Sequence, residues 1–274
     1  MNTREKKLEA IGRLLDVQER LRKECPWDRK QTFESLRPNT IEEVFELADA
    51  LMRHDLHNVK KELGDVMEHV VFYAILGDEA GAFDIADVCN QEADKLMFRH
   101  PFIDWTGWPG DPKAQVTDMP EDGEAVEVTW EQIKQREKDG NKTVLSGVPD
   151  ALPSLIKAYR IQDKARNVGF DWEHKEDVWD KVREELGELE AELKREDAER
   201  SAKELGDFLF SVINAARLYH INPDNALEET NQKFIRRFNY VERKAKEAGK
   251  SLKDMTLGEM DALWDEAKRQ ERTR

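Results

Sequence analysis

The sequence predicts an all-α protein built from two tandem, duplicated helical-bundle units. Apolar residues recur at steps of three and four along most of the 274-residue chain, as at Leu205, Phe208, Leu209 and Val212, which places them on one helix face. Four prolines and three glycines within residues 101–123 break this pattern near the middle of the chain. We therefore expect units at 1–105 and 148–274, joined by a Pro/Gly-rich acidic linker at 106–147 with a short helix near 130–138.

The two units repeat each other in sequence. Residues 41–74 align without gaps on residues 183–216, at an offset of 142, and are identical at 14 of the 34 positions. The identities include both acids of each EE pair, the next Glu, and all of KELGD. Two unrelated charged helices are a poor account of so long an ungapped match, so duplication is the better explanation.

Composition excludes several classes of partner. The net charge of −15 makes general binding to nucleic acid or to an anionic membrane unfavourable. Cys25 and Cys89 have no zinc-site spacing, and two cysteines in a chain of this length suggest a reducing compartment. The charged start MNTREKKLEAIGRLL has no signal-peptide pattern, and no apolar run approaches the ~18 residues of a membrane span. A cytoplasmic protein is expected.

Each unit carries the acidic pattern EExxE, followed after a fixed interval by ExxD. The first unit contributes Glu42, Glu43, Glu46, Glu62 and Asp65, and the second contributes Glu184, Glu185, Glu188, Glu204 and Asp207. At about 100° per residue, the acids of each motif share one helix face. The 15 residues between Glu188 and Glu204 suit a helix end, a turn near Arg195–Ala198 and a returning helix. An antiparallel hairpin would bring the two acidic faces together.

Such a cluster predicts a metal site. Gathered carboxylates repel one another unless a cation neutralises them, and an all-oxygen set suits Mg²⁺, with Mn²⁺ as the alternative. The competing interpretation is a solvated helix face, but an apolar stripe follows each ELGD and places the acids near the interior. A di-iron site is disfavoured because no histidine follows a glutamate with the Glu-x-x-His spacing. His54 and His57 are expected at an exposed helix end.

Phosphate binding must come from metal and basic side chains, because the chain has neither a Walker loop nor a GxGxxG motif. Lys181 lies one turn before Glu184 and Glu185 on the same face. The segment NQKFIRRF adds further polar and basic residues: Asn231, Lys233, Arg236 and Arg237. The i,i+4 pair Lys233 and Arg237 suits a phosphate grip, although an ordinary basic helix end is an open alternative.

The first unit has lost part of this phosphate grip. Asn39 occupies the position of Lys181, and Pro101 ends the helix that carries Lys95 and Arg99. We therefore expect the C-terminal unit to be the main catalytic site, with the N-terminal cluster as a weaker copy.

The motifs CPWDRKQTFESLRP, EExxE with ELGD, RHPFI, GFDW and NQKFIRRF together resemble the two-domain MazG nucleoside triphosphate pyrophosphohydrolases over roughly residues 8–270. The resemblance implies the all-α NTP pyrophosphatase fold, Mg²⁺, a homodimer, and cleavage of an NTP or dNTP to a nucleoside monophosphate and pyrophosphate. Metal ligands carried over by motif are Glu185, Glu188, Glu204 and Asp207, with Glu43, Glu46, Glu62 and Asp65 as the weaker copy.

The same resemblance assigns the remaining roles. Glu184 would orient or deprotonate the attacking water beside Glu185 and Glu188. Lys181, Lys233 and Arg237 would hold the triphosphate, and Trp264 would lie near the nucleotide. With Asn231 and Arg236 of the basic segment and with Glu184, these residues form the expected substrate-binding set. Helix packing is the alternative for Trp264. The competing function is a non-catalytic helical nucleotide sensor or interaction scaffold, which would bind NTP and Mg²⁺ without turnover.

Overall fold

The computed structural model describes residues 1–272 except 114–115, 121–122, 124–125, 127–132 and 134–142. These described residues form nine α-helices and no strand, which confirms the all-α prediction. The chain divides into two compact units, Met1–Lys134 and Gln135–Arg274. This division falls within the predicted linker at 106–147, whose boundaries stay a prediction, and the helix expected near 130–138 lies largely outside the described residues. Over the part of the chain that is described, no helix has the length and apolarity to cross a bilayer.

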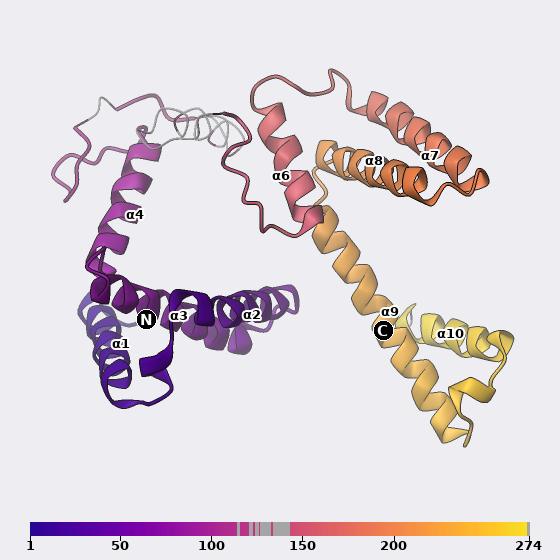
Figure 1. Ribbon diagram of the computed structural model, residues 1–274, viewed down its shortest axis with the longest axis horizontal. Coiled ribbons are helices and arrows are strands. Elements are labelled where there is room, and N and C mark those ends of the chain that lie inside the picture. The colour runs from indigo at the N-terminus through magenta and orange to yellow at the C-terminus, as the bar shows by residue number, and fades with distance from the viewer. Residues whose placement is uncertain (114–115, 121–122, 124–125, 127–132, 134–142, 273–274) are drawn as a thin grey trace. The chain divides into compact units, whose positions relative to one another are not determined.

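The N-terminal unit is built on a long hairpin with flanking helices, labelled as in Figure 1. Its elements are α1 (Arg4–Glu24), the 3₁₀ turn η1 (Asp28–Lys30), α2 (Phe33–Met52), α3 (Leu56–Glu79) and α4 (Ile85–Arg99). Helix α1 packs on α3, and α4 follows α3 after a short turn. The buried cluster of Leu36, Phe72 and Leu76, covered by Tyr73, holds α2 against α3. As expected, α4 ends at Arg99, just before Pro101.

The C-terminal unit repeats the hairpin and extends it. It contains α6 (Ser154–Arg166), η2 (Lys175–Asp177), α7 (Val178–Lys194), α8 (Ala198–Leu218), α9 (Pro223–Glu247), η3 (Leu252–Asp254) and α10 (Leu257–Arg272). Helices α7 and α8 form the hairpin, α6 packs on α8, and α10 folds back on α9 (Figure 1). Val178, Val182 and Ala215 form the buried core between α7 and α8.

The two hairpins use the same turn. Helix α3 is capped by Asp55, which accepts from the amides of His57 and Asn58, and α8 is capped by Asp197 at the matching position. The residue before each cap is left-handed, with φ of 53° at His54 and 56° at Glu196. A non-glycine residue pays a steric cost in this region, so its recurrence at both turns marks a shared tight geometry. The turn predicted near Arg195–Ala198 is thereby confirmed.

One face of each hairpin is less buried than the periodicity predicts. Leu205 and Leu209 on α8 are 45% and 51% exposed, whereas Ile213 is buried. At the matching positions of α3, Leu63 and Met67 are 52% and 46% exposed. The predicted apolar stripe is therefore only partly core, because flanking helices of the described chain cover only part of each hairpin.

Candidate functional site

The C-terminal hairpin gathers three of the predicted acids. Glu185 and Glu188 on α7 and Glu204 on α8 each offer a carboxylate oxygen within 4.8 Å of the others. Glu185 is buried, while Glu188 is exposed. Partial desolvation, together with the negative charges of Glu188 and Asp207, raises the pKa of Glu204. The hairpin therefore concentrates negative charge at one point, as the EExxE and ExxD spacing predicts.

A lysine lies on this cluster. Lys181 is placed one turn earlier on α7, and its Nζ lies 2.6 Å from Glu185 and 3.0 Å from Glu184. Hydrogen bonds to these two carboxylates raise the pKa of the Lys181 ammonium, so it stays charged. A fixed cation beside the acids offers a contact for a phosphate oxygen.

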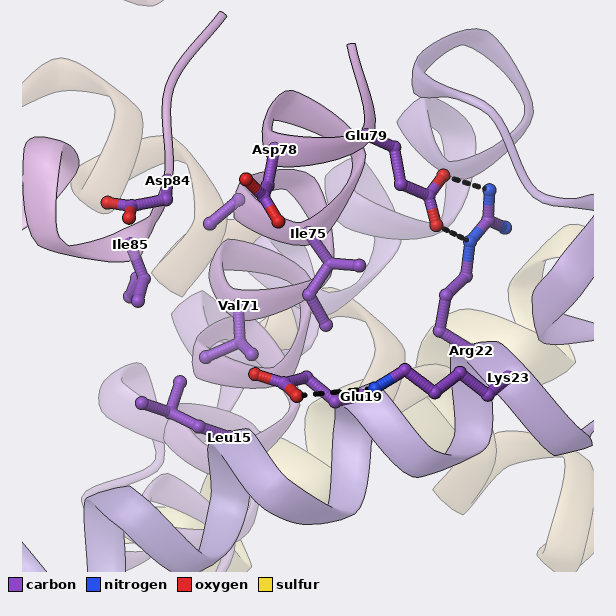
Figure 2. Close-up of a pocket in the computed structure, with 11 residues that line it drawn as sticks. Leu15, Glu19, Arg22, Lys23, Val71, Ile75, Asp78, Glu79, Asp84 and Ile85 are labelled. Atoms are coloured by element: carbon purple, nitrogen blue, oxygen red, sulfur yellow. Dashed lines mark hydrogen bonds and ion pairs between the residues drawn. The ribbon is translucent and has the colours of Figure 1, made fainter. Parts of the chain in front are cut away.

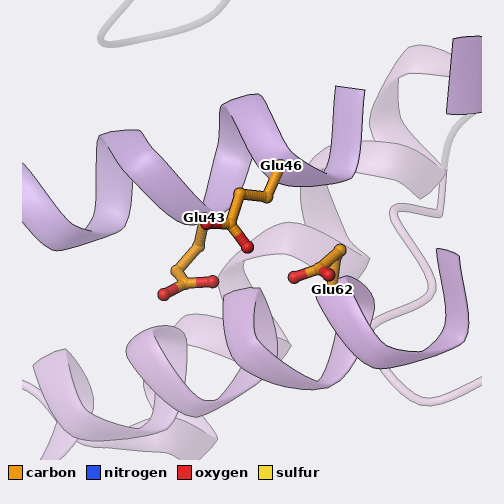
Figure 3. Close-up of side chains that lie close together, drawn as sticks. All are labelled: Glu43, Glu46 and Glu62. Carbon is orange, nitrogen blue, oxygen red and sulfur yellow. The ribbon is translucent and has the colours of Figure 1, made fainter. Parts of the chain in front are cut away.

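The N-terminal hairpin gathers the matching acids. Figure 3 shows Glu43 and Glu46 on α2 pointing toward Glu62 on α3, and their ligand oxygens also lie within 4.8 Å of one another. The Glu62 side chain is only 8% exposed, and its Oε2 is buried without a hydrogen-bond partner. Burial, reinforced by the charges of Asp65 and Glu46, raises the pKa of Glu43. This cluster is thus a second region of crowded negative charge.

The two clusters differ in which helix supplies the lysine that pairs with the acids. Asn39 leaves no lysine on α2, but Lys61 on α3 pairs with Glu62 at 3.0 Å and with Asp65 at 3.5 Å. In the C-terminal unit the matching Lys203 pairs instead with Glu199, one turn earlier on α8, at 2.8 Å. The sequence did not predict that Lys61 pairs with the acids of its cluster and Lys203 does not, because both lysines belong to identical KELGD motifs.

The expected phosphate-binding residues of α9 make their contacts with α10. Arg237 donates to Glu271 at 2.7 and 2.8 Å and lies over the ring of Trp264, and Arg236 lies 3.9 Å from Glu271. Asn231 bonds Glu228 within α9 at 3.1 Å, and Lys233 forms no ion pair with the described residues. Trp264 packs against Phe234 with ring centroids 5.0 Å apart. The contacts found within the described chain therefore join this basic segment to α10 and not to the α7–α8 acids.

A separate cavity of about 280 Å³ lies between α1, α3 and the start of α4. Figure 2 shows Arg22 paired with Glu79 and Lys23 paired with Glu19 at its edge. The Arg22 guanidinium also donates to the carbonyl oxygens of Asp28 and Gln31. With its cations already paired, this cavity is poorly suited to hold a triphosphate.

A family model described as the MazG nucleotide pyrophosphohydrolase domain matches residues 31–103 and 174–242. The chain belongs to the MazG nucleotide pyrophosphohydrolase family. Each matched MazG segment contains one hairpin with its acid cluster, and the second also contains Lys233 and Arg237. Trp264 lies beyond the second segment. The family assignment confirms the resemblance and the two repeated domains.

Proteins similar to this MazG chain support the same assignment. The Escherichia coli K12 nucleoside triphosphate pyrophosphohydrolase is 38% identical over 96% of this chain and 99% of its own length. The Thermotoga maritima protein named nucleoside triphosphate pyrophosphohydrolase/pyrophosphatase MazG is 38% identical over 93% of this chain and 94% of its own. Bacillus subtilis YabN, an uncharacterised protein, is 44% identical over 90% of this chain but only 49% of its own length.

Proposed function

We propose that this chain hydrolyses nucleoside triphosphates to nucleoside monophosphate and pyrophosphate, mainly in the C-terminal unit. The observation that carries the proposal is the cluster of Glu185, Glu188 and Glu204 with Lys181 beside it. The similar proteins of Escherichia coli and Thermotoga maritima bear the name of this activity. The N-terminal cluster, which lacks a lysine on α2, is proposed as the weaker copy.

The acid residues fit a hard divalent cation. Their donors are all carboxylate oxygens, which Mg²⁺ and Mn²⁺ prefer. Burial, together with the charges of neighbouring carboxylates, raises the pKa of Glu204 and of Glu43, so a bound cation would favour the ionised form of both residues. In the N-terminal cluster, Oε2 of Glu62 is buried without a hydrogen-bond partner. We propose Glu185, Glu188, Glu204 and Asp207 as Mg²⁺ ligands, with Glu43, Glu46, Glu62 and Asp65 as the matching set.

When bound, Mg²⁺ would neutralise phosphate charge and acidify a water molecule. Glu184, exposed at the edge of the cluster, is proposed to accept the proton of the water that attacks the α phosphorus. The bond between the α phosphorus and the bridging oxygen then breaks, and pyrophosphate leaves. Lys181 would contact the phosphate oxygens and stabilise the charge that develops there.

A second copy of the chain is proposed to complete the site. Helix α8 exposes an apolar stripe that includes Leu205, Leu209 and Val212. Contact with a partner surface would remove these side chains from solvent. Helix α9 presents Lys233 without an ion pair to the described residues, and Arg237 and Trp264 share the α9–α10 surface. A homodimer would bury the stripes and allow these basic side chains to reach the acids of a neighbouring copy.

The test is a product assay with mixed NTPs and dNTPs in Mg²⁺. We expect nucleoside monophosphate and pyrophosphate in equal amounts, with no activity after chelation. Release of nucleoside diphosphate and orthophosphate would contradict attack at the α phosphorus. Binding of NTP and Mg²⁺ without turnover would instead support the sensor or scaffold alternative.

A further inference from the structure

Helix α10 carries a carboxylate that contacts the basic segment of α9. Arg237 donates from Nε and Nη2 to the same oxygen, Oε2 of Glu271, at 2.8 and 2.7 Å. The other carboxylate oxygen, Oε1, lies 3.9 Å from Nε of Arg236. Glu271 lies in the last turn of α10, which folds back on α9 (Figure 1). One carboxylate therefore contacts two of the residues that are expected to bind phosphate.

A second contact holds the same guanidinium by its flat face. Trp264 lies seven residues before Glu271 on α10, which is two turns, or about 10 Å, along the same face. The guanidinium carbon of Arg237 lies 5.8 Å from the centroid of the Trp264 ring, and that ring packs against Phe234 on α9. An aromatic face attracts a cation placed over it. The Arg237 side chain is only 18% exposed, so the ion pair and the ring together restrict its rotamers.

These contacts leave one edge of the guanidinium for a ligand. Glu271 occupies the edge formed by Nε and Nη2, whereas Nη1 makes no hydrogen bond or ion pair with the described residues. A phosphate oxygen binds best to a guanidinium that already has the required orientation. Because a free arginine loses rotamer freedom when it binds, an arginine held in advance binds phosphate at a lower entropic cost.

The charge of Glu271 acts in the opposite direction, because a carboxylate near the site repels phosphate. Its side chain is 35% exposed, and it faces the cations Arg236 and Arg237. At physiological ionic strength the Debye length is about 8 Å, so repulsion between partly exposed charges is weakened. The entropic advantage of a fixed arginine is not screened by salt. We therefore expect orientation to outweigh repulsion.

The N-terminal unit ends its basic segment differently. Its residues 94–99, DKLMFR, match QKFIRR at 232–237, so Arg99 corresponds to Arg237. Helix α4 ends at Arg99, whereas α9 continues to Glu247 and is followed by α10. The described residues 100–113 form no helix that could return along α4 as α10 returns along α9. Within the described chain, a helix that returns to the basic segment is therefore a feature of the C-terminal unit.

We propose that Glu271 is a positioning residue, which holds Arg237 against Trp264 so that the Nη1 edge binds pyrophosphate oxygens. This proposal rests on the proposed function, which makes pyrophosphate a product and assigns Arg237 to the phosphates. The role of Glu271 is indirect, because it acts through the arginine and makes no contact with the substrate.

The experiment measures the Kd of pyrophosphate by calorimetry, with the full chain in Mg²⁺. Glu271→Ala should raise this Kd about three- to tenfold, the cost of immobilising one long side chain on binding. Glu271→Gln keeps an oxygen that accepts from Arg237 and should restore most of the wild-type affinity. In the Arg237→Met background, Glu271→Ala should have no further effect, because the arginine through which it acts is gone.

Tyr240→Phe is the matched control for the docking of α10 on α9. The Tyr240 hydroxyl donates to Oε1 of Glu266 at 2.6 Å and accepts from Nε2 of Gln270 at 2.9 Å. Its removal weakens the same helix pair without changing a contact of Arg237. This variant should lower Tm and leave the Kd of pyrophosphate unchanged.

Tighter pyrophosphate binding in both Glu271 variants would overturn the proposal, since Glu271 would then compete with phosphate for Arg237. An unchanged Kd in Glu271→Ala would also overturn it. So would equal weakening by Tyr240→Phe and Glu271→Ala, since the docking of α10 would then be the cause. The proposed function fails separately, through absence of pyrophosphate release in the product assay, because these binding measurements need no turnover.

Discussion

Replacing Lys181 with methionine tests how the acid cluster is held together. Glu185 is only 9% exposed and would lose its 2.6 Å ion-pair partner, whereas the lysine itself is 41% exposed. Breaking a buried pair costs about 3–5 kcal/mol and an exposed pair contributes about 0–1 kcal/mol. This half-exposed pair should lie between these limits, at about 1–2 kcal/mol. For a unit of this size that corresponds to a fall in Tm of about 3–8 °C.

Thermal unfolding with and without Mg²⁺ is the assay. The loss of Tm should shrink at saturating Mg²⁺, because the ion supplies the missing positive charge. The kcat/KM for NTP should fall about 10- to 100-fold, the value of one hydrogen bond to a charged group. The matched variant Asn39→Lys places a cation beside Glu43 and should raise the stability of the metal-free chain. If Lys181→Met matched wild type in both Tm and kcat/KM, the role given to this lysine would be wrong.

Two further substitutions probe the N-terminal unit. Glu62→Gln replaces the unpaired buried oxygen and should lower the number of Mn²⁺ ions bound in a calorimetric titration; an unchanged stoichiometry would remove Glu62 from the metal site. Burial raises the pKa of Glu68 above its ordinary 4.5, so ionisation weakens the folded state as pH rises through that window. Glu68→Gln, which keeps an acceptor for Gln18, should therefore raise Tm at pH 7 and leave it unchanged near pH 4. A stabilisation equal at both pH values would contradict this account.

Much of the hairpin could be predicted from sequence because it depends on local spacing. The EExxE and ExxD intervals fix which acids share a face, and fifteen residues leave little freedom for the connection between them. The αL residue at Glu196 and the cap at Asp197 then close the turn. These features need no knowledge of the rest of the chain.

The partners that individual side chains choose could not be predicted from the sequence. Lys61 and Lys203 lie in the same KELGD motif, but one reaches the acid cluster and the other pairs with Glu199. Local competition among carboxylates decides this, and sequence spacing does not encode it. The buried glutamines Gln18 and Gln162 also gave no signal, because a polar residue on a charged helix is ordinarily exposed. A repeat alignment extended to α1 and α6 could have paired them.

The exposure of Leu205 and Leu209 shows a similar limit. Periodicity identifies an apolar helix face, but it does not say whether this chain or another copy covers that face. The interpretation of the stripe as core was therefore incomplete. The structure was needed to distinguish its exposed part, at Leu205 and Leu209, from its buried part, at Ile213.

The central claim, that the C-terminal cluster is the main catalytic site, is tested most directly by comparing Glu185→Ala with Glu43→Ala. Pyrophosphate release from NTP in Mg²⁺ should fall by about 100-fold or more in Glu185→Ala, because a metal ligand beside Lys181 is lost. Glu43→Ala should retain much of the wild-type rate. Equal losses in the two variants, or a greater loss in Glu43→Ala, would contradict the assignment of the main site to the C-terminal unit.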